Sequence, residues 1–175
     1  MFIALSGTPG VGKSTAGLIL ERRGHHVIEL ATLALREGVQ KEYDIQRETF
    51  EVDLDNLERI LPASNPTDRF LLVGHLSHLM PVEMAIVLRC RPSLLGQRLR
   101  ARGYKERKVR ENMEAEACDV ILIESLEEVG EVYEIDASGL TPDQVADSVE
   151  QILRGETEKY GPGHIDWSEE VLSWF

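Results

Sequence analysis

The stretch Gly7-Thr8-Pro9-Gly10-Val11-Gly12-Lys13-Ser14 decides the fold of this 175-residue chain. It matches the pattern G-x-x-x-x-G-K-[ST], in which a glycine-rich loop points backbone N–H groups at phosphate oxygens. The apolar run 2–6 before it predicts a short buried strand, and residues 13–23 after it predict a helix. The loop thus lies between a strand and a helix N-terminus, where the partial positive charge of the helix favours anions.

If the loop binds a nucleoside triphosphate, its residues have distinct chemical roles. The backbone of Gly10, Val11 and Gly12 would surround the phosphates. The ammonium group of Lys13 would bridge the β- and γ-phosphates, the hydroxyl of Ser14 would be a ligand of Mg²⁺, and Thr15 would bind an inner phosphate. A glycine turn that merely joins strand to helix is the alternative, and the agreement of pattern and context favours phosphate binding.

Outward from this loop, apolar runs alternate with helical patterns. Further strands are predicted at 26–30, 70–73, 85–88 and 129–135, and the uninterrupted apolar tetrads at 70–73 and 85–88 are typical of parallel strands covered on both faces. Helices are predicted at 31–37, 53–61, from 92 to the break at Gly103, in a single segment carrying Val109 to Leu122, and at 141–153 with Thr141 as N-cap. Residues 38–52 have weak periodicity. The alternation predicts an α/β sandwich around a parallel sheet.

Composition limits the class of protein. Hydrophobic residues make up 42% and charged residues 29%, as in a soluble globular chain, and the length suits one domain. A net charge of −12 disfavours direct binding to nucleic acid or to an anionic membrane. No stretch is apolar for long enough to span a bilayer. Cys90 and Cys118 form neither a disulfide framework nor a metal-binding spacing, so we expect a cytoplasmic protein whose two thiols are buried or bystanders.

Charge is distributed unevenly along the chain. Nine of the nineteen Lys and Arg residues lie between Arg89 and Arg110, and thirteen Asp and Glu residues with no Lys or Arg lie between Glu111 and Glu150. The acidic run is interpreted first as a solvated helix face. The basic run, centred on residues 97–108, is typical of a kinase lid that closes over a transferring phosphoryl group. The patterns of a GTPase are missing: 136–139 matches D-x-x-G only after the last strand, and 65–68 has Pro in place of Lys.

Four motifs together carry a resemblance. They are the loop 7–15, the run Gly74-His75-Leu76-Ser77-His78-Leu79, the lid Arg102-Gly103-Tyr104 with Lys108 and Glu111-Asn112, and Asp136-Ala137-Ser138-Gly139-Leu140-Thr141-Pro142. In this order they resemble the atypical adenylate kinases of the CINAP type, which include adenylate kinase isoenzyme six and its archaeal relatives. The resemblance covers residues 1 to about 153. It implies the three-layer P-loop nucleoside-monophosphate-kinase fold with a central five-stranded parallel sheet.

The resemblance also implies an activity, cofactors and partners. The activity is transfer of the γ-phosphoryl group of ATP to AMP, with accompanying ATPase activity, and the partner is a basic ribosomal protein during maturation of the small ribosomal subunit. ATP and Mg²⁺ would be held at Gly10, Gly12, Lys13, Ser14 and Thr15, with Arg102 of a lid at about 101–111 on ATP. An insert at about 31–52 would bind AMP through Arg36, for which an ordinary surface arginine is the alternative. His75 would orient a nucleophilic water or a phosphate oxygen, or else be a histidine satisfied by backbone at a strand end.

The chain departs from the family pattern at one position. The aspartate of the family's Asp-x-His motif should be residue 73, and this chain has Val73. Metal placement then depends on Ser14, substrate phosphates and water, unless a carboxylate elsewhere substitutes. The loss affects turnover more than nucleotide binding, because the loop and Lys13 do not need that carboxylate.

The tail 154–175 is expected to be an appendix to the kinase domain. Asp166 and Glu169 have the spacing of a capping box, and Trp167, Val171 and Trp174 would share one face of a short amphipathic helix that docks on its own domain or, alternatively, anchors a partner. Two other functions stay open. One is a nucleotide-gated assembly chaperone whose acidic surface holds a basic ribosomal protein, and the other is a kinase of another small acceptor.

Overall fold

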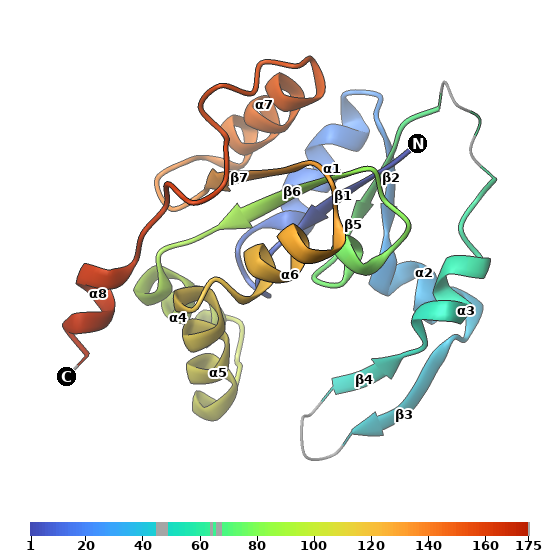
Figure 1. Cartoon of the computed structure of the whole chain (residues 1–175). Coiled ribbons are helices and arrows are strands. Elements are labelled where there is room, and N and C mark those ends of the chain that lie inside the picture. The colour runs from blue at the N-terminus through green and yellow to red at the C-terminus, as the bar shows by residue number, and fades with distance from the viewer. Residues whose placement is uncertain (45–48, 64, 66–67, 175) are drawn as a thin grey trace.

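Five parallel strands form the central sheet of the computed structural model, which describes residues 1–44, 49–63, 65 and 68–174. The strands are β1 (Phe2–Ser6), β2 (His26–Glu29), β5 (Phe70–Val73), β6 (Met84–Arg89) and β7 (Val132–Asp136), in the spatial order β2-β5-β1-β6-β7 (Figure 1). Numbered along the chain within this sheet, the order is 2-3-1-4-5. The prediction of a five-stranded parallel sheet is confirmed.

Helices cover both faces of the sheet and make it the middle of three layers. On one face α1 (Lys13–Arg22) packs beside α7 (Pro142–Leu153), and the largest apolar core lies beneath them. On the other face α6 (Val120–Glu128) covers a smaller core around Ala85, Val87 and Val132; it is the helix in front of the sheet in Figure 1. Because both faces are buried, the central strands do not alternate: β5 is apolar along its whole length, and β1 and β6 are apolar up to their last residues.

The segment between β2 and β5 contains α2 (Leu30–Glu37), a hairpin of β3 (Gln40–Asp44) with β4 (Thr49–Val52), and α3 (Leu54–Arg59). The hairpin extends away from the sheet at the lower right of Figure 1. No strand was predicted here, because two short strands that form their own sheet apart from the main core carry no continuous apolar run. The predicted insert at about 31–52 therefore contains a helix and a hairpin, with residues 45–48 outside the described part.

The basic segment forms α4 (Pro92–Ala101) and the start of α5 (Glu106–Ala117), joined by a short turn at Gly103. The single helix predicted from Val109 to Leu122 is wrong. The chain breaks at Asp119, which has a left-handed backbone with φ +56°, and α6 begins at Val120. The carboxylate of Asp119 is held by Arg89 of β6, so a tertiary contact interrupts the helical pattern.

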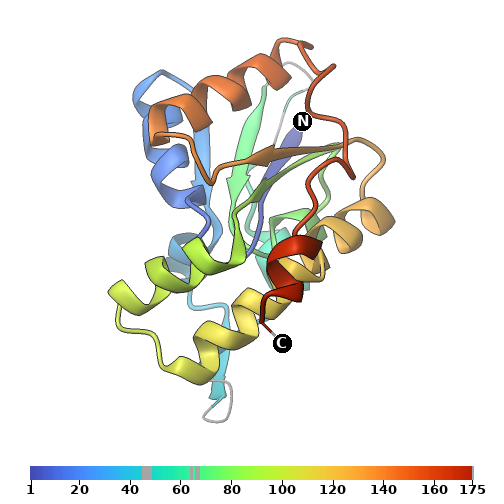
Figure 2. The ribbon, with the colours of Figure 1, turned by 90° about the vertical axis from the view of Figure 1, so that its left-hand side faces the viewer.

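The tail runs from α7 down to α8 (Ser168–Leu172), as the red segment of Figure 2 shows. The capping box predicted for Asp166 and Glu169 is wrong: Trp167 is the N-cap residue, and the carboxylate of Asp166 accepts from Ser168 in a tight turn before the helix. Trp167 is buried, and Glu170 accepts from the backbone N–H of Ser93 at 2.5 Å. The tail packs on its own domain, as the first interpretation expected, while Trp174 stays 37% exposed.

In the part of the chain that the structure describes, every helix is too short or too polar to cross a bilayer. The remaining element, the 3₁₀ helix η1 (Ser77–Leu79), follows β5 and places Ser77 and His78 in the interior.

Candidate active site

The glycine-rich loop connects β1 to α1 at the carboxyl edge of the sheet. At two positions of this loop the backbone accommodates only glycine. Gly7 has φ +134°, and a Cβ there would lie 2.3 Å from the backbone oxygen of Leu88; Gly10 has φ +100°, and its Cβ would lie 2.8 Å from Leu95 of α4. Both backbone conformations are open to glycine and strained for other residues. The loop therefore curls tightly over the end of the sheet, and the free N–H groups of the first turn of α1 face the concave side.

Lys13 begins α1 and folds back across the loop. Its Nζ donates to the backbone oxygens of Gly7 at 2.6 Å and Thr8 at 3.0 Å, and the side chain is buried. Burial lowers the pKa of Lys13 to about 7, against the opposing effect of the carboxylates of Glu116 and Glu29. Among the described residues no carboxylate contacts this group directly. When it is protonated, the oxygens of a bound phosphate can therefore replace the two backbone oxygens as its hydrogen-bond acceptors.

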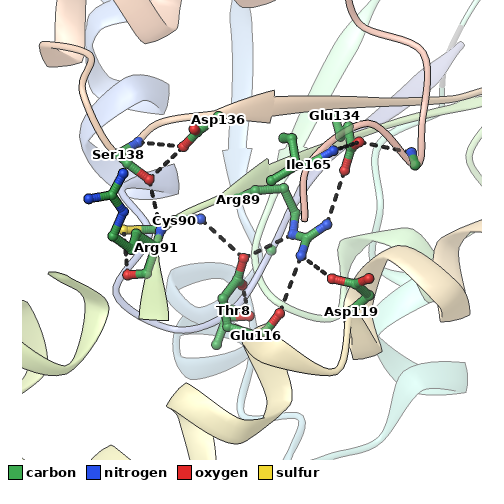
Figure 3. Close-up of polar contacts among 12 residues, drawn as sticks. Thr8, Arg89, Cys90, Arg91, Glu116, Asp119, Glu134, Asp136, Ser138 and Ile165 are labelled. Carbon is green, nitrogen blue, oxygen red and sulfur yellow. Dashed lines mark hydrogen bonds and ion pairs between the residues drawn. The ribbon is translucent and has the colours of Figure 1, made fainter. Parts of the chain in front are cut away.

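The first half of the loop is anchored to a buried ionic cluster (Figure 3). The hydroxyl of Thr8 donates to Glu116 of α5 at 2.5 Å, and Glu116 also accepts from the guanidinium of Arg89 at 2.9 Å. Arg89 contacts two further carboxylates, those of Glu134 and Asp119. Glu116 and Glu134 belong to the acidic run 111–150, for which the sequence predicts a solvated helix face. Both side chains are instead buried, because the charge of Arg89 lies between them.

Ser14, the predicted magnesium ligand, meets a carboxylate that sequence analysis did not single out. Its hydroxyl donates to Glu29 Oε1 at 3.0 Å, and Glu29 is the last residue of β2. The second oxygen of Glu29 accepts from the backbone N–H and the hydroxyl of Thr32 and so caps α2. No sequence pattern marks Glu29, because the contact joins two βα units that only the sheet brings together.

His75 follows β5 and lines a cavity of about 230 Å³ together with Lys13, Ser14, Glu29, Arg102 and Tyr104. The protein atoms packed around the imidazole, and next the positive charge of Lys13, lower the pKa of His75 to about 4. The ring is therefore neutral near pH 7, and it is accessible from the cavity. His78, three residues on, is different: it is buried between the hydroxyl of Ser6 and the carboxylate of Glu124.

On one side of Lys13 lies a cavity of about 390 Å³ between the loop, α4 and the start of α7. Arg98 donates to the backbone oxygen of Val11 at 3.2 Å and supports the loop from α4. Arg102 is exposed at the end of α4 and borders this cavity as well as the one containing His75. The rest of the lining is mostly small or apolar, including Gly10, Val11, Gly12, Thr15, Ala101, Ala137, Leu140, Pro142 and Val145.

On the other side of Ser14 lies a cavity of about 870 Å³ between α1, β2, α2 and the chain before β5. Arg36 borders it from the last turn of α2, where its Nε donates to Glu37 at 2.8 Å and its side chain is exposed. Val73 forms part of the wall, and Ser14 and Glu29 border this cavity and the one containing His75. The first two cavities lie at the carboxyl edge of the sheet, and the largest one begins there at Ser14, Glu29 and Val73 and extends beside β2 and α1 as far as Phe70, the first residue of β5.

The structure brings all the predicted site residues to this edge, with Arg36 at its far side. It adds four residues that sequence analysis did not place in the site: Glu29, Arg98, Tyr104 and Glu116. Arg98 and Tyr104 lie within the basic segment 97–108, so this segment of the sequence already indicated where they would be found. Among the described residues, no three His, Cys, Asp or Glu side chains converge as a metal cage.

The chain is similar to known proteins in sequence and in fold. Residues 3–119 match a family model described as an AAA domain. A protein of Archaeoglobus fulgidus named "Putative adenylate kinase" is 43% identical over 174 residues, which cover 98% of this chain and 94% of that protein. A protein of the same name from Thermococcus onnurineus is 41% identical, covering 97% and 93%. The solved YorR protein from Bacillus subtilis, in complex with phosphorylated GDP, has a TM-score of 0.57 at 15% identity, covers 89% of this chain and 97% of its own, and is similar in fold alone.

Proposed function

This chain belongs to the archaeal adenylate kinase family of P-loop nucleotide kinases, and we propose that it transfers the γ-phosphoryl group of ATP to AMP, giving two molecules of ADP. The observation that carries the proposal is the order of the cavities: a mostly apolar one beside the loop, a small charged one over Lys13, and a large one beyond Ser14. A phosphotransferase needs this order, because donor and acceptor must approach the same phosphoryl group from opposite sides.

The donor is assigned to the cavity beside α4 and α7. Leu140, Pro142 and Val145 supply apolar surface for a base, while the loop N–H groups and Thr15 face the phosphates. Arg102 borders both this cavity and the next one, so a guanidinium at this position can contact the donor phosphates and the group in transfer. Lys13 neutralises the charge that develops between the β- and γ-phosphates.

The acceptor is assigned to the cavity bordered by Arg36, whose exposed guanidinium matches a monophosphate in charge and shape. In the transfer, an oxygen of the AMP phosphate forms a bond to the γ-phosphorus as the bond to the β-phosphate oxygen of ATP breaks, and the electron pair of that bond leaves with ADP. A phosphate monoester is mostly dianionic at pH 7, so its oxygen carries no proton to remove. Neutral His75 therefore needs only to orient an oxygen and does not act as a base.

Ser14 and Glu29 are the hard oxygen groups next to the loop, and they fit Mg²⁺ in chemical type. Bound with the nucleotide, the ion would supply positive charge to the phosphate oxygens. The chain itself supplies the hydroxyl of Ser14, whose lone pairs are available because its proton is donated to Glu29.

The proposal is tested by measuring ADP formation from ATP and Mg²⁺ with and without AMP. We expect AMP-dependent formation of two ADP per ATP, and loss of transfer in the Lys13→Ala variant. Arg36→Ala should raise the KM for AMP and leave the KM for ATP near its wild-type value, since Arg36 borders the acceptor cavity alone. Rapid transfer to other small acceptors with none to AMP, or full activity without Lys13, would sink the assignment.

A second role, as an ATPase that holds a basic small-subunit ribosomal protein, has one observation in its favour. Helix α6 exposes Ile123 and Leu126, each 49% exposed, next to the exposed carboxylates of Glu127 and Glu128. A surface that is both apolar and acidic suits a basic protein partner. Binding of a purified ribosomal protein of this kind should weaken with salt and with the double change Glu127→Lys, Glu128→Lys. Undetectable or salt-insensitive binding would count against this role, and ADP formed from ATP alone would separate ATPase activity from transfer to AMP.

A further inference from the structure

The end of β5 lacks the carboxylate that usually serves the metal in P-loop enzymes. In that class Mg²⁺ is held by the Ser or Thr of the loop and by an acidic residue from a neighbouring strand. Here β5 ends in Val73, which is fully buried and packs against Gly17 of α1. An apolar side chain at this position can neither bind the ion nor orient its ligands.

Glu29 lies where it can supply the missing group. Strands β2 and β5 pair in parallel with Glu29 opposite Val73, so the two residues occupy the same level of adjacent strands and their side chains leave the same face of the sheet. The side chain of Glu29 is one methylene longer than that of an aspartate. It reaches across to Ser14, the metal ligand of the loop, at 3.0 Å.

The direction of the hydrogen bond between them matters. A serine hydroxyl has one proton and two lone pairs. Since the proton of Ser14 is donated to Glu29, the lone pairs are left for a cation, and the carboxylate fixes how they are oriented. Outer carboxylates that hold an inner ligand in this way raise the metal affinity of a site.

The position of Glu29 between the cavities bears on how its charge would act on bound nucleotides. It borders both the cavity over Lys13 and the acceptor cavity, and its negative charge acts on Lys13 and His75. Without a cation, a carboxylate between two phosphate-binding cavities would repel both nucleotides. With a divalent cation beside it, the same charge becomes attractive.

We propose that Glu29 is the carboxylate of the magnesium site in this chain: it orients the hydroxyl of Ser14 and places one negative charge beside the ion, in the role that Val73 cannot fill. The inference rests on the proposed function, since it requires a nucleotide on the loop. Glu29 is a positioning residue, acting on the metal through Ser14. Its other oxygen, which caps α2 through Thr32, serves the fold and is a separate role.

The test uses binding and not turnover. Glu29→Gln keeps the length of the side chain and one oxygen that can cap α2, but it removes the charge. The matched control is Glu83→Gln, an exposed glutamate that precedes β6 at the opposite, amino-terminal edge of the sheet. Circular dichroism should show wild-type helix content for both variants. Mn²⁺ as a spin probe, titrated in the presence of saturating ADP, then reports metal affinity by electron paramagnetic resonance, and calorimetry reports ADP affinity in EDTA.

For Glu29→Gln we expect the apparent affinity for Mn²⁺ in the ADP complex to fall about 10- to 100-fold, as for the loss of an outer partner of a metal ligand. Affinity for ADP in EDTA should stay equal or increase, because a repulsive charge is gone. Glu83→Gln should leave both values at the wild-type level. Wild-type Mn²⁺ affinity in Glu29→Gln would overturn the inference alone, whereas failure of the wild-type protein to bind ADP at all would overturn the proposed function.

Discussion

Lys13 has a pKa far below the ordinary value of a lysine. Its ordinary pKa near 10.5 would keep it charged at every physiological pH, yet burial lowers the pKa to about 7. Bound phosphates favour the charged form and raise this pKa again. Nucleotide binding above pH 7 therefore has to take up a proton on Lys13.

The sign of the pH dependence follows. Above pH 7 the free protein increasingly holds Lys13 neutral, so affinity for ADP should fall as pH rises, by up to about tenfold per pH unit. Calorimetric titrations with ADP between pH 7.5 and 9, in buffers of different ionisation enthalpy, should show the decrease and the proton uptake. Lys13→Ala should bind more weakly and lose the decrease, while sharing any titration of the nucleotide. A wild-type affinity that stays constant over this range would contradict the assignment.

His75 is the second residue whose environment decides its chemistry. Its pKa of about 4 makes it neutral at pH 7 in the protein without nucleotide, and the neutral ring orients oxygen atoms by hydrogen bonding. Water needs such orientation more than the phosphate of AMP, which Arg36 and the acceptor cavity already hold.

We therefore expect His75→Ala to lower ATP hydrolysis more than transfer to AMP, with a change of at least about tenfold in the ratio of the two rates. Coupled assays of phosphate release and of AMP-dependent ADP formation measure that ratio. Equal losses in the two rates would mean that His75 acts on the transferring group itself.

Helix α7 begins with a capping box, in which both hydrogen bonds are made between residues of its own N-terminus. Thr141 caps the helix through the backbone N–H of Gln144 at 3.3 Å, and Gln144 returns a contact to the backbone N–H of Thr141 at 2.8 Å. The similar spacing of Asp166 and Glu169 forms no such box, because the carboxylate of Asp166 bonds Ser168 two residues on. The difference is a competing short-range turn, which the spacing does not exclude.

Thr141→Ala should lower the free energy of unfolding by about 1 kcal/mol, the usual value for loss of an N-cap. Urea denaturation followed by circular dichroism measures it. Thr141→Ser keeps the hydroxyl and serves as the control that should stay near the wild type. An unchanged midpoint in Thr141→Ala would show that packing of α7 on α1 makes the cap redundant.

For the whole molecule, the cluster around Arg89 joins segments that are distant in sequence (Figure 3). Through Glu116 it reaches the loop at Thr8, and through Glu134 it reaches the tail, since Glu134 Oε1 accepts from the backbone N–H of Gly163 at 2.8 Å. The guanidinium is 2% exposed and contacts three carboxylates. The phosphate-binding loop and the tail therefore depend on one buried charge.

Arg89→Met should destabilise the protein by about 3–5 kcal/mol, because it leaves Glu116 and Glu134 buried without a cation. Arg91→Met, at a side chain 62% exposed with a carboxylate 3.9 Å away, should cost less than about 1 kcal/mol. Chemical denaturation of the two variants compares them directly. Similar small losses for both would mean that water or a protonated carboxyl replaces Arg89.

The predicted domain boundaries, with a kinase domain at 1–153, an insert at about 31–52, a lid at about 101–111 and an appendix at 154–175, stay predictions, as do the roles of all the predicted site residues. The structure shows that the tail packs on the domain through Glu134 and Glu170. It shows that the segment 101–111 comprises the end of α4, the turn around Gly103 and the first half of α5.

The sequence by itself determined the glycine-rich loop 7–14 and the five parallel strands, because glycines in a fixed pattern and short runs rich in apolar residues are local signals. Tertiary structure alone decided the partners. Glu29 meets Ser14, Glu116 meets Thr8, and Asp119 breaks a helix to reach Arg89, each across many residues of chain. The physical reason is that a carboxylate has the same local pattern whether it is solvated or buried, and only the fold brings it the cation or hydroxyl that makes burial favourable.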